Sequence, residues 1–250
     1  MRFCSLGSGS GGNATVVEAR EGARVHRVLV DCGFSLRELE LRLARAGLQP
    51  ADLHAIFVTH EHGDHVGCAL TLARRYRLPL WMSRGTWRAI DADGEGVELR
   101  FARDGEAIAI GALQLRPFTV PHDAAEPLQL RCSDGAASLA LLTDAGSITA
   151  HLLEQLRGCG ALLLECNHDA QMLARSRYPA SLKARIGGSH GHLSNATAAS
   201  ILAECLHGGL RHIVAAHLSE QNNTPDLARA ALAAACGAAS ADILVADPAE

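Results

Sequence analysis

The sequence THEHGDH follows the apolar run IFV and brings three imidazoles and two carboxylates into the six positions from His60 to His65. Groups of these kinds compete for protons at such density unless a cation binds them together. In extended backbone alternate side chains share a face, so His60 and His62 can bind one metal ion. Gly63 permits a turn that directs Asp64 and His65 toward a second position. A solvated polar loop is the alternative, but the H-x-H-x-D-H spacing after an apolar strand favours a metal site.

Three further apolar runs end in a polar residue of the metal-binding types. His122 follows LRPFTVP, Asp144 follows SLALLT, and His217 follows RHIVAA. Each of them alone is more simply a turn residue, but with the first motif they complete two ligand shells. One shell has His60, His62, His122 and Asp144, and the other has Asp64, His65, Asp144 and His217. Asp144 bridges the two ions and a shared water or hydroxide completes both shells, a mixture of ligands that suits zinc, manganese or iron.

Asp31 ends the apolar run VLVD and has no evident partner in the sequence. We expect it behind the metal ligands, where its carboxylate accepts a hydrogen bond from a ligand imidazole or from the backbone of the His-rich loop. A carboxylate that only closes a turn is the alternative.

The glycines of LGSGSGG satisfy the pattern G-x-G-x-x-G after a strand, as in dinucleotide-binding proteins. A dinucleotide site needs a helix after the glycines, whereas this chain continues with the β-branched residues TVV and a turn at Glu21 and Gly22. The sequence therefore predicts a hairpin, in which the glycines let backbone approach a substrate or metal site.

The remaining chain alternates short apolar runs with amphipathic stretches. We predict helices at residues 35–47, 65–76, 148–158, 194–206 and 225–236, and strands at residues 2–6, 14–19, 25–33, 53–59, 78–83, 97–101, 106–110, 113–120, 127–132, 138–144, 161–167, 211–218 and 242–247. This order fits an α/β fold with two face-to-face sheets and helices outside, a four-layer αββα sandwich. No linker rich in Pro, Gly or Ser divides the chain, so we predict a single domain over residues 1–250.

Composition limits the alternatives. The net charge is −4, so no global basic field indicates a nucleic-acid-binding protein, although a local patch is compatible with one. The eight cysteines form no C-x-x-C pair, which argues against a cysteine zinc site and a disulfide framework. No segment has the character of a signal peptide or a membrane span, and we expect a cytoplasmic protein without a membrane partner.

These motifs resemble those of the metallo-β-lactamase superfamily, whose fold is the αββα sandwich. SLGSGSGGN, LVDCG, THEHGDHVG, PHDAAEP, LLTDAG, LLLECNHD, GGSHGHLSN and AAHLSEQNN together resemble the YycJ/WalJ-type hydrolases, which are related to ribonuclease Z and the PhnP phosphodiesterases. The resemblance implies a hydrolase with two divalent ions, Zn²⁺, Mn²⁺ or Fe. It also implies DNA exonuclease activity, which the residues themselves do not show.

Catalytic roles follow from this resemblance. Asp64 is expected to be essential for turnover. His192 is similar to a histidine that assists proton transfer to the leaving oxygen, and Glu165 is similar to the carboxylate that orients it. A residue that only precedes a helix start is the alternative for His192.

A stretch of positive charge lies between Glu165 and His192 in the sequence. ARSRYPASLKARIGG contains no acid, and its side chains could bind successive phosphates or stack on a base. The expected substrate contacts are Arg175, Arg177, Tyr178, Lys183 and Arg185, with His168 as a further candidate. A solvated helix face is the alternative.

The sequence thus predicts a dinuclear metal-dependent phosphodiesterase, with DNA as the expected polymer and a metal-bridging hydroxide as the nucleophile. One alternative keeps the metals and changes the substrate to a small phosphodiester or a thioester. Another is a metal-stabilised binding module without turnover. The native metal, the choice between DNA and RNA, and whether the chain forms a homo-oligomer stay open.

Overall fold

The computed structural model describes residues 1–237, 239 and 242–246, and these residues group into two compact units. Unit 1 comprises Met1–Thr119 and Ala124–Ala137. Unit 2 comprises Val120–Asp123 and the described part of Ser138–Ala246. The single domain that we predicted over residues 1–250 stays a prediction.

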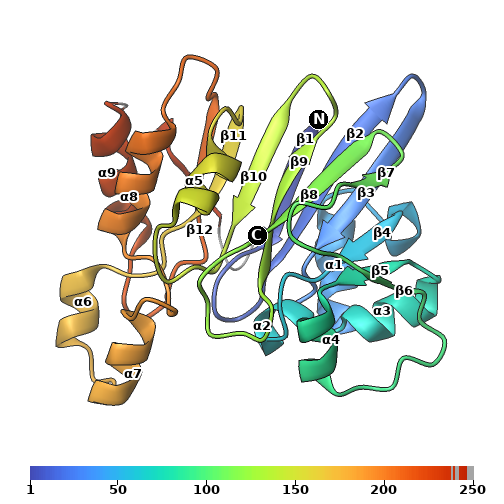
Figure 1. The fold of residues 1–250 in the computed structure, drawn as a ribbon, viewed down its shortest axis with the longest axis horizontal. Coiled ribbons are helices and arrows are strands. Elements are labelled where there is room, and N and C mark those ends of the chain that lie inside the picture. Colours follow the sequence, from blue (N-terminus) through green and yellow to red (C-terminus); the bar gives the residue numbers. More distant parts are fainter. Residues whose placement is uncertain (238, 240–241, 247–250) are drawn as a thin grey trace. The chain divides into compact units, whose positions relative to one another are not determined.

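Unit 1 contains a six-stranded sheet, short helices and an antiparallel ladder that belongs to a second, seven-stranded sheet (Figure 1). The sheet has the order β1-β2-β3-β4-β5-β6, antiparallel from β1 to β3 and parallel from β3 to β6. Its strands are β1 (Arg2–Gly7), β2 (Ala14–Glu21), β3 (Arg24–Val30), β4 (Ala55–Phe57), β5 (Leu80–Met82) and β6 (Leu99–Phe101). The ladder is β7 (Ile108–Ile110), β8 (Leu113–Thr119) and β9 (Leu128–Ser133), and the helices are α1 (Leu36–Arg45), η1 (Pro50–Asp52), α2 (Gly63–Val66), α3 (Ala69–Tyr76) and α4 (Arg84–Ile90).

Unit 2 is built on parallel strands with the order β10-β11-β12-β13. The strands are β10 (Ser138–Leu142), β11 (Ala161–Glu165), β12 (His212–Ala216) and β13 (Leu244–Val245). The helices are α5 (Ala150–Leu156), α6 (Ala170–Arg175), α7 (Ala180–Ile186), α8 (Asn195–Cys205) and α9 (Pro225–Cys236), and α8 packs against α9 (Figure 1). Because the strands are parallel, the residues that follow β10, β11 and β12 gather at one edge. Of the predicted strand at residues 242–247, Asp247 lies outside the described residues.

The hairpin predicted for the N-terminal glycine segment is present. β1 and β2 pair antiparallel on either side of residues 8–13, and no helix follows the glycines. A dinucleotide-binding site is therefore ruled out, because a strand follows the glycines, as the β-branched residues predicted.

The core of unit 1 lies between its sheet and the helices α1 and α3. Leu39 and Leu43 of α1 are fully buried with Leu72 of α3 against Leu29 and other residues of the central strands. The i, i+4 spacing gives α1 one apolar face. The predicted cap is also present, since the Oγ atom of Ser35 accepts a hydrogen bond from the backbone N–H of Glu38 at 3.3 Å.

The prediction of one continuous helix at residues 65–76 is wrong. The structure has two helices, α2 and α3, which are separated at Gly67 and Cys68. Gly67 has a φ of 29°, and a Cβ atom there would lie 2.2 Å from the carbonyl oxygen of Cys32. Close packing of this glycine against the segment after Asp31 overrides the helical pattern. The helices α4, α6 and α7 were not predicted.

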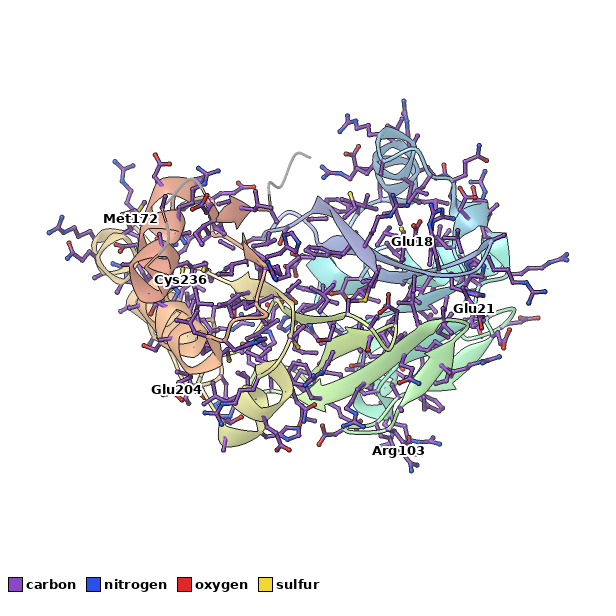
Figure 2. The ribbon with its side chains drawn as sticks, turned by 90° about the horizontal axis from the view of Figure 1, so that it is seen from above. Glu18, Glu21, Arg103, Met172, Glu204 and Cys236 are labelled. Atoms are coloured by element: carbon purple, nitrogen blue, oxygen red, sulfur yellow. The ribbon has the colours of Figure 1, made fainter. Side chains whose placement is uncertain are left out.

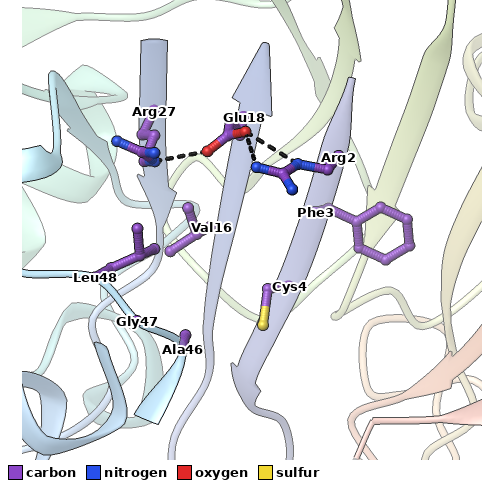
Figure 3. A pocket seen from close by; sticks show the side chains of 9 residues that line it. All are labelled: Arg2, Phe3, Cys4, Val16, Glu18, Arg27, Ala46, Gly47 and Leu48. Carbon is purple, nitrogen blue, oxygen red and sulfur yellow. Dashed lines mark hydrogen bonds and ion pairs between the residues drawn. The ribbon is translucent and has the colours of Figure 1, made fainter. Parts of the chain in front are cut away.

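Arg2 of β1 and Arg27 of β3 lie on either side of Glu18 of β2 (Figure 3). The carboxylate of Glu18 is 2.8 Å from Nε of Arg27 and 3.4 Å from Nε of Arg20, and it also pairs with the guanidinium of Arg2. Arg2, Glu18 and Arg27 border a pocket of about 340 Å³, which residues 46–48 also line. Other charged side chains, such as those of Arg103 and Glu204, project outward (Figure 2). No helix among the described residues is both long and apolar enough to span a membrane.

Candidate functional site

Asp31 holds His65 in unit 1. Asp31 follows β3 with a positive φ of 62°, and 2% of its surface is exposed. Its Oδ2 atom lies 2.8 Å from Nδ1 of His65, and its Oδ1 atom accepts a hydrogen bond from the backbone N–H of Thr59 at 2.8 Å. The carboxylate thus contacts both a predicted ligand and the backbone just before His60, as the sequence led us to expect.

The imidazoles of the His-rich loop lie against one another. Nε2 of His60 is 3.0 Å from Nδ1 of His62, and the ring centroids of His60 and His65 are 4.1 Å apart. His60 and His65 are fully buried, and Oγ1 of Thr59 lies 3.0 Å from Nδ1 of His60. Two ring nitrogens that converge in this way need a proton or a cation between them.

Asp64 is partly exposed and close to the same histidines. Its Oδ2 atom lies 3.6 Å from Nε2 of His65, and the side-chain amide of Asn13 lies 3.1 Å from that same nitrogen. Asn13 also donates to the carbonyl oxygen of Asp64 at 3.2 Å. A Cβ atom at Gly33 would lie 1.8 Å from that carbonyl oxygen, so only glycine allows this approach. The glycine loop therefore touches the site through Asn13, a residue to which the sequence analysis gave no role.

His217 is anchored in unit 2 by a backbone carbonyl. It follows β12 with a positive φ of 53° and is 2% exposed. Its Nδ1 atom lies 2.5 Å from the carbonyl oxygen of Thr143 and 3.1 Å from Oδ1 of Asp144, which is itself 1% exposed. The carbonyl can only accept, so Nδ1 carries the hydrogen and a neutral ring keeps its lone pair on Nε2.

His122 is held in the same manner. Its Nδ1 atom lies 3.0 Å from the carbonyl oxygen of Gly191, and its Nε2 atom is 3.7 Å from Oδ1 of Asp144. Burial lowers the pKa of His122, although the charge of Asp144 opposes that shift. A neutral imidazole is the form that binds a metal ion.

The buried Glu165 and the partly exposed His192 form a pair beside Asp144. Nδ1 of His192 is 2.7 Å from Oε1 of Glu165 and 3.4 Å from Oδ1 of Asp144. The other oxygen of Glu165 accepts from the backbone N–H groups of Ala145 at 2.8 Å and Leu193 at 3.3 Å, which fixes the carboxylate. Burial acts to lower the pKa of His192, but the hydrogen bond and charge of Glu165 raise it overall. The predicted pairing of these two residues is present in the structure.

The same arrangement recurs at three of the predicted ligands. His65, His122 and His217 each direct Nδ1 to a buried acceptor, so that Nε2 is the ring nitrogen that could bind a metal ion, the usual orientation of metal-binding histidines. In unit 2, ligand atoms of Asp144, Glu165, His192 and His217 all lie within 4.8 Å of one another. This set of imidazole nitrogens and carboxylate oxygens fits divalent ions such as zinc, manganese or iron.

The predicted substrate-binding residues separate into three groups. Arg175, at the end of α6, and Arg177 are exposed, and Tyr178 beside them is half-buried. Lys183 donates to the carbonyl oxygen of Ala174 at 2.7 Å, and Arg185 pairs with Asp123 at 2.5 Å. His168 is 4% exposed and burial lowers its pKa, so only a group that entered the interior of unit 2 could reach it.

Two sequence comparisons and one structural comparison bear on the whole chain. The chain is 36% identical over 232 residues to exodeoxyribonuclease YycJ of Bacillus anthracis, which covers 92% of this chain and 86% of that protein. It is 32% identical over 233 residues to exodeoxyribonuclease WalJ of Streptococcus pneumoniae, covering 91% and 85%. The metallo-β-lactamase fold protein YhfI of Bacillus subtilis superposes with a TM-score of 0.75 at 17% identity, covering 98% of this chain and 96% of that one.

The family itself is shown by a match to the beta-lactamase superfamily domain over residues 26–217. The predicted αββα fold class is confirmed by this match and by the structural likeness. The resemblance to YycJ/WalJ-type hydrolases is likewise confirmed. The chain therefore belongs to the metallo-β-lactamase superfamily and is a metal-dependent hydrolase of the YycJ/WalJ type.

Proposed function

We propose that the chain is a dinuclear phosphodiesterase that degrades DNA from an end. The observation that carries this proposal is the shared orientation of His65, His122 and His217, each of which directs Nδ1 to a buried acceptor, so that Nε2 is the ring nitrogen suited to bind a metal ion. Two relatives that span most of the chain carry the name exodeoxyribonuclease, which favours DNA among the phosphodiester substrates.

We assign the metal ligands as the sequence suggested them. One ion would be held by His60, His62, His122 and Asp144, and the other by Asp64, His65, Asp144 and His217. Two divalent ions, Zn²⁺ or Mn²⁺ or else Fe, would supply an activated water at neutral pH and neutralise charge on the phosphoryl oxygens.

Residues other than the proposed ligands orient the site, transfer the proton and bind the substrate. Asp31 accepts the Nδ1 hydrogen of His65 and so holds the ring in the orientation in which Nε2 would bind the metal ion. His192 supplies a proton to the leaving oxygen, and Glu165 keeps its ring oriented for that transfer. Arg175 and Arg177 attract the phosphate backbone, with Tyr178 as a stacking surface and Lys183 and Arg185 as weaker contributors because both already have partners. We place this chemistry in the cytoplasm.

The experiment begins with metal content and substrate choice. The purified chain is analysed for bound metal, stripped with a chelator and reloaded with Zn²⁺ or Mn²⁺. It is then incubated with end-labelled single- and double-stranded DNA and RNA, with bis-p-nitrophenyl phosphate and with a small thioester. We expect mononucleotides to be released from DNA and activity to depend on the added metal. A chain that binds no metal, or that cleaves only the thioester, would contradict the proposal.

Asp64→Ala separates turnover from binding. We expect a loss of at least about 100-fold in turnover with the circular dichroism spectrum unchanged, because the variant removes a proposed ligand from a partly exposed position. Asp226→Ala, which removes an exposed carboxylate near the start of α9, is the matched control. Full turnover in Asp64→Ala would contradict the proposed role of Asp64, whereas a metal-loaded wild-type chain that binds DNA without turnover would support a metal-stabilised binding module instead.

A further inference from the structure

Glu61 stands between two proposed metal ligands, and the proposed chemistry gives it no role. Its carboxylate is directed toward the segment of residues 124–128 within unit 1. Oε1 accepts a hydrogen bond from the backbone N–H of Ala125 at 2.6 Å, and Oε2 lies 3.5 Å from Oγ1 of Thr86. Both oxygens of Glu61 therefore face donors of the protein.

Two further bonds hold the same segment. The carboxylate of Glu126 accepts from the backbone N–H of Gly85 at 2.6 Å, in the first turn of α4. The backbone N–H of Leu128 donates to the carbonyl oxygen of Thr59 at 3.0 Å. The segment is thus fastened at residues 125, 126 and 128, and two of the three bonds go to the residues that flank His60.

Packing indicates that this attachment is specific. A Cβ atom at Gly85 would lie 2.4 Å from Cβ of Glu126 and 3.1 Å from the carbonyl carbon of Ala125. The backbone of the first turn of α4 therefore lies so close to residues 125 and 126 that a side chain at position 85 would collide with them. If the Glu61 side chain only projected into solvent, neither this glycine nor the short hydrogen bond from the Ala125 N–H to Glu61 would be needed.

The segment matters because of what precedes it in the chain. Ala125 is three residues after His122, a separation that spans at most about 10 Å of extended backbone. We propose that Glu61 is a positioning residue, which locks residues 124–128 onto the His60–His65 loop and so fixes the backbone from which His122 extends. The role of His122 as a ligand rests on the function proposed above.

Hydrogen exchange tests the attachment of residues 124–128 to the His60–His65 loop in the protein without bound metal. In the metal-free protein, Glu61→Ala is expected to raise the exchange rate of the Ala125 amide at least about tenfold, because its acceptor is gone. Glu61→Gln keeps an acceptor oxygen and is expected to preserve protection, whereas Glu61→Asp withdraws the carboxylate by one methylene and is expected to behave like Glu61→Ala. Glu21→Ala, on the exposed end of β2, is the control. Unchanged exchange at Ala125 in both Glu61→Ala and Glu61→Asp would overturn the proposal.

Metal affinity tests the consequence. In chelator competition with Zn²⁺, Glu61→Ala is expected to weaken binding about 10- to 100-fold and Glu61→Gln to leave it near wild type. In a His122→Ala background, Glu61→Ala is expected to cost nothing further, since its effect passes through His122. An equal loss in that background, or an equal loss in Glu61→Gln, would overturn the positioning role. A wild-type chain that binds no Zn²⁺ would instead refute the proposed function, while the exchange result would still report on the lock.

Discussion

Asp31 and His65 are separated by 34 positions in the sequence, yet the carboxylate of one lies 2.8 Å from Nδ1 of the other in the interior of unit 1. Because Asp31 also accepts from the backbone N–H of Thr59, a single carboxylate orients a proposed ligand and ties down the loop that carries three more. Loss of this carboxylate should therefore weaken metal binding, even though Asp31 is not itself a proposed ligand.

The substitution Asp31→Asn tests this relationship. Asparagine tolerates the positive φ of this position, so the backbone is retained while one acceptor oxygen becomes a donor. We expect metal affinity to fall about 10- to 100-fold and the free energy of unfolding to fall by about 1–3 kcal/mol. Chelator competition and urea unfolding measure the two effects, with Asp226→Asn as the exposed control. Wild-type affinity in Asp31→Asn would mean that the carboxylate only closes a turn.

Replacement of His192 or Glu165 tests proton transfer to the leaving group. His192→Ala and Glu165→Gln are each expected to slow DNA cleavage about 100- to 10,000-fold. Bis-p-nitrophenyl phosphate should be affected much less, since p-nitrophenolate leaves without a proton. Steady-state rates on both substrates give the ratio. An equal loss on both would assign the pair to metal binding or structure.

The exposed arginines near α6 are tested by salt dependence. If Arg175 and Arg177 each neutralise a phosphate, the double variant Arg175→Ala/Arg177→Ala should bind DNA more weakly, and the slope of log affinity against log salt should become shallower by about 1–2. The chemical step on bis-p-nitrophenyl phosphate should stay unchanged. Arg103→Ala, an exposed arginine of unit 1, is the control. A slope equal to that of the wild type would leave these arginines as solvated surface residues.

The cluster around Glu18 predicts a pH effect on stability. Burial acts to raise the pKa of Glu18, but the hydrogen bonds and charges of Arg2 and Arg27 lower it overall from 4.5. A carboxylate whose pKa is lower in the native state stabilises that state above the unfolded pKa, and this contribution is lost as the pH falls through the native pKa. Glu18→Gln should therefore lower the free energy of unfolding by about 1 kcal/mol at pH 7.

Below about pH 4 the difference between wild type and Glu18→Gln should shrink toward zero. Urea unfolding at a series of pH values measures it, with Glu21→Gln on the same strand as the control. A difference that is constant from pH 7 to pH 3 would show that charge at Glu18 does not contribute.

The sequence allowed most strands to be predicted, because strands depend on local pattern, and the same pattern is the basis of the proposed metal ligands. Period-two apolar runs marked β8 and β9, and the polar residues after β10 and β12 are Asp144 and His217. The pairing of His192 with Glu165 was found through family resemblance, since nothing in their local sequence relates two residues 27 positions apart.

The residues that were missed act through long-range contacts. Asn13 reaches Asp64 across 51 positions, and Glu61 meets Ala125 across 64. The break at Gly67 depends on the backbone of Cys32, which no helical periodicity can reveal. The four basic residues from Arg175 to Arg185 looked equivalent in the sequence, but Asp123 pairs with Arg185 and the carbonyl of Ala174 accepts from Lys183, which leaves Arg175 and Arg177 as the better candidates.

The left-handed backbone at Asp31 and His217 bears on how such an enzyme could decay. A side chain other than glycine costs about 1 kcal/mol in this conformation, so each position keeps its residue at the expense of the fold. Glycine would relieve that backbone cost at either site, but it would also remove the buried hydrogen bonds of Asp31 and His217. A duplicated copy released from catalysis would therefore gain nothing from glycine there, and these two residues would outlast its chemistry.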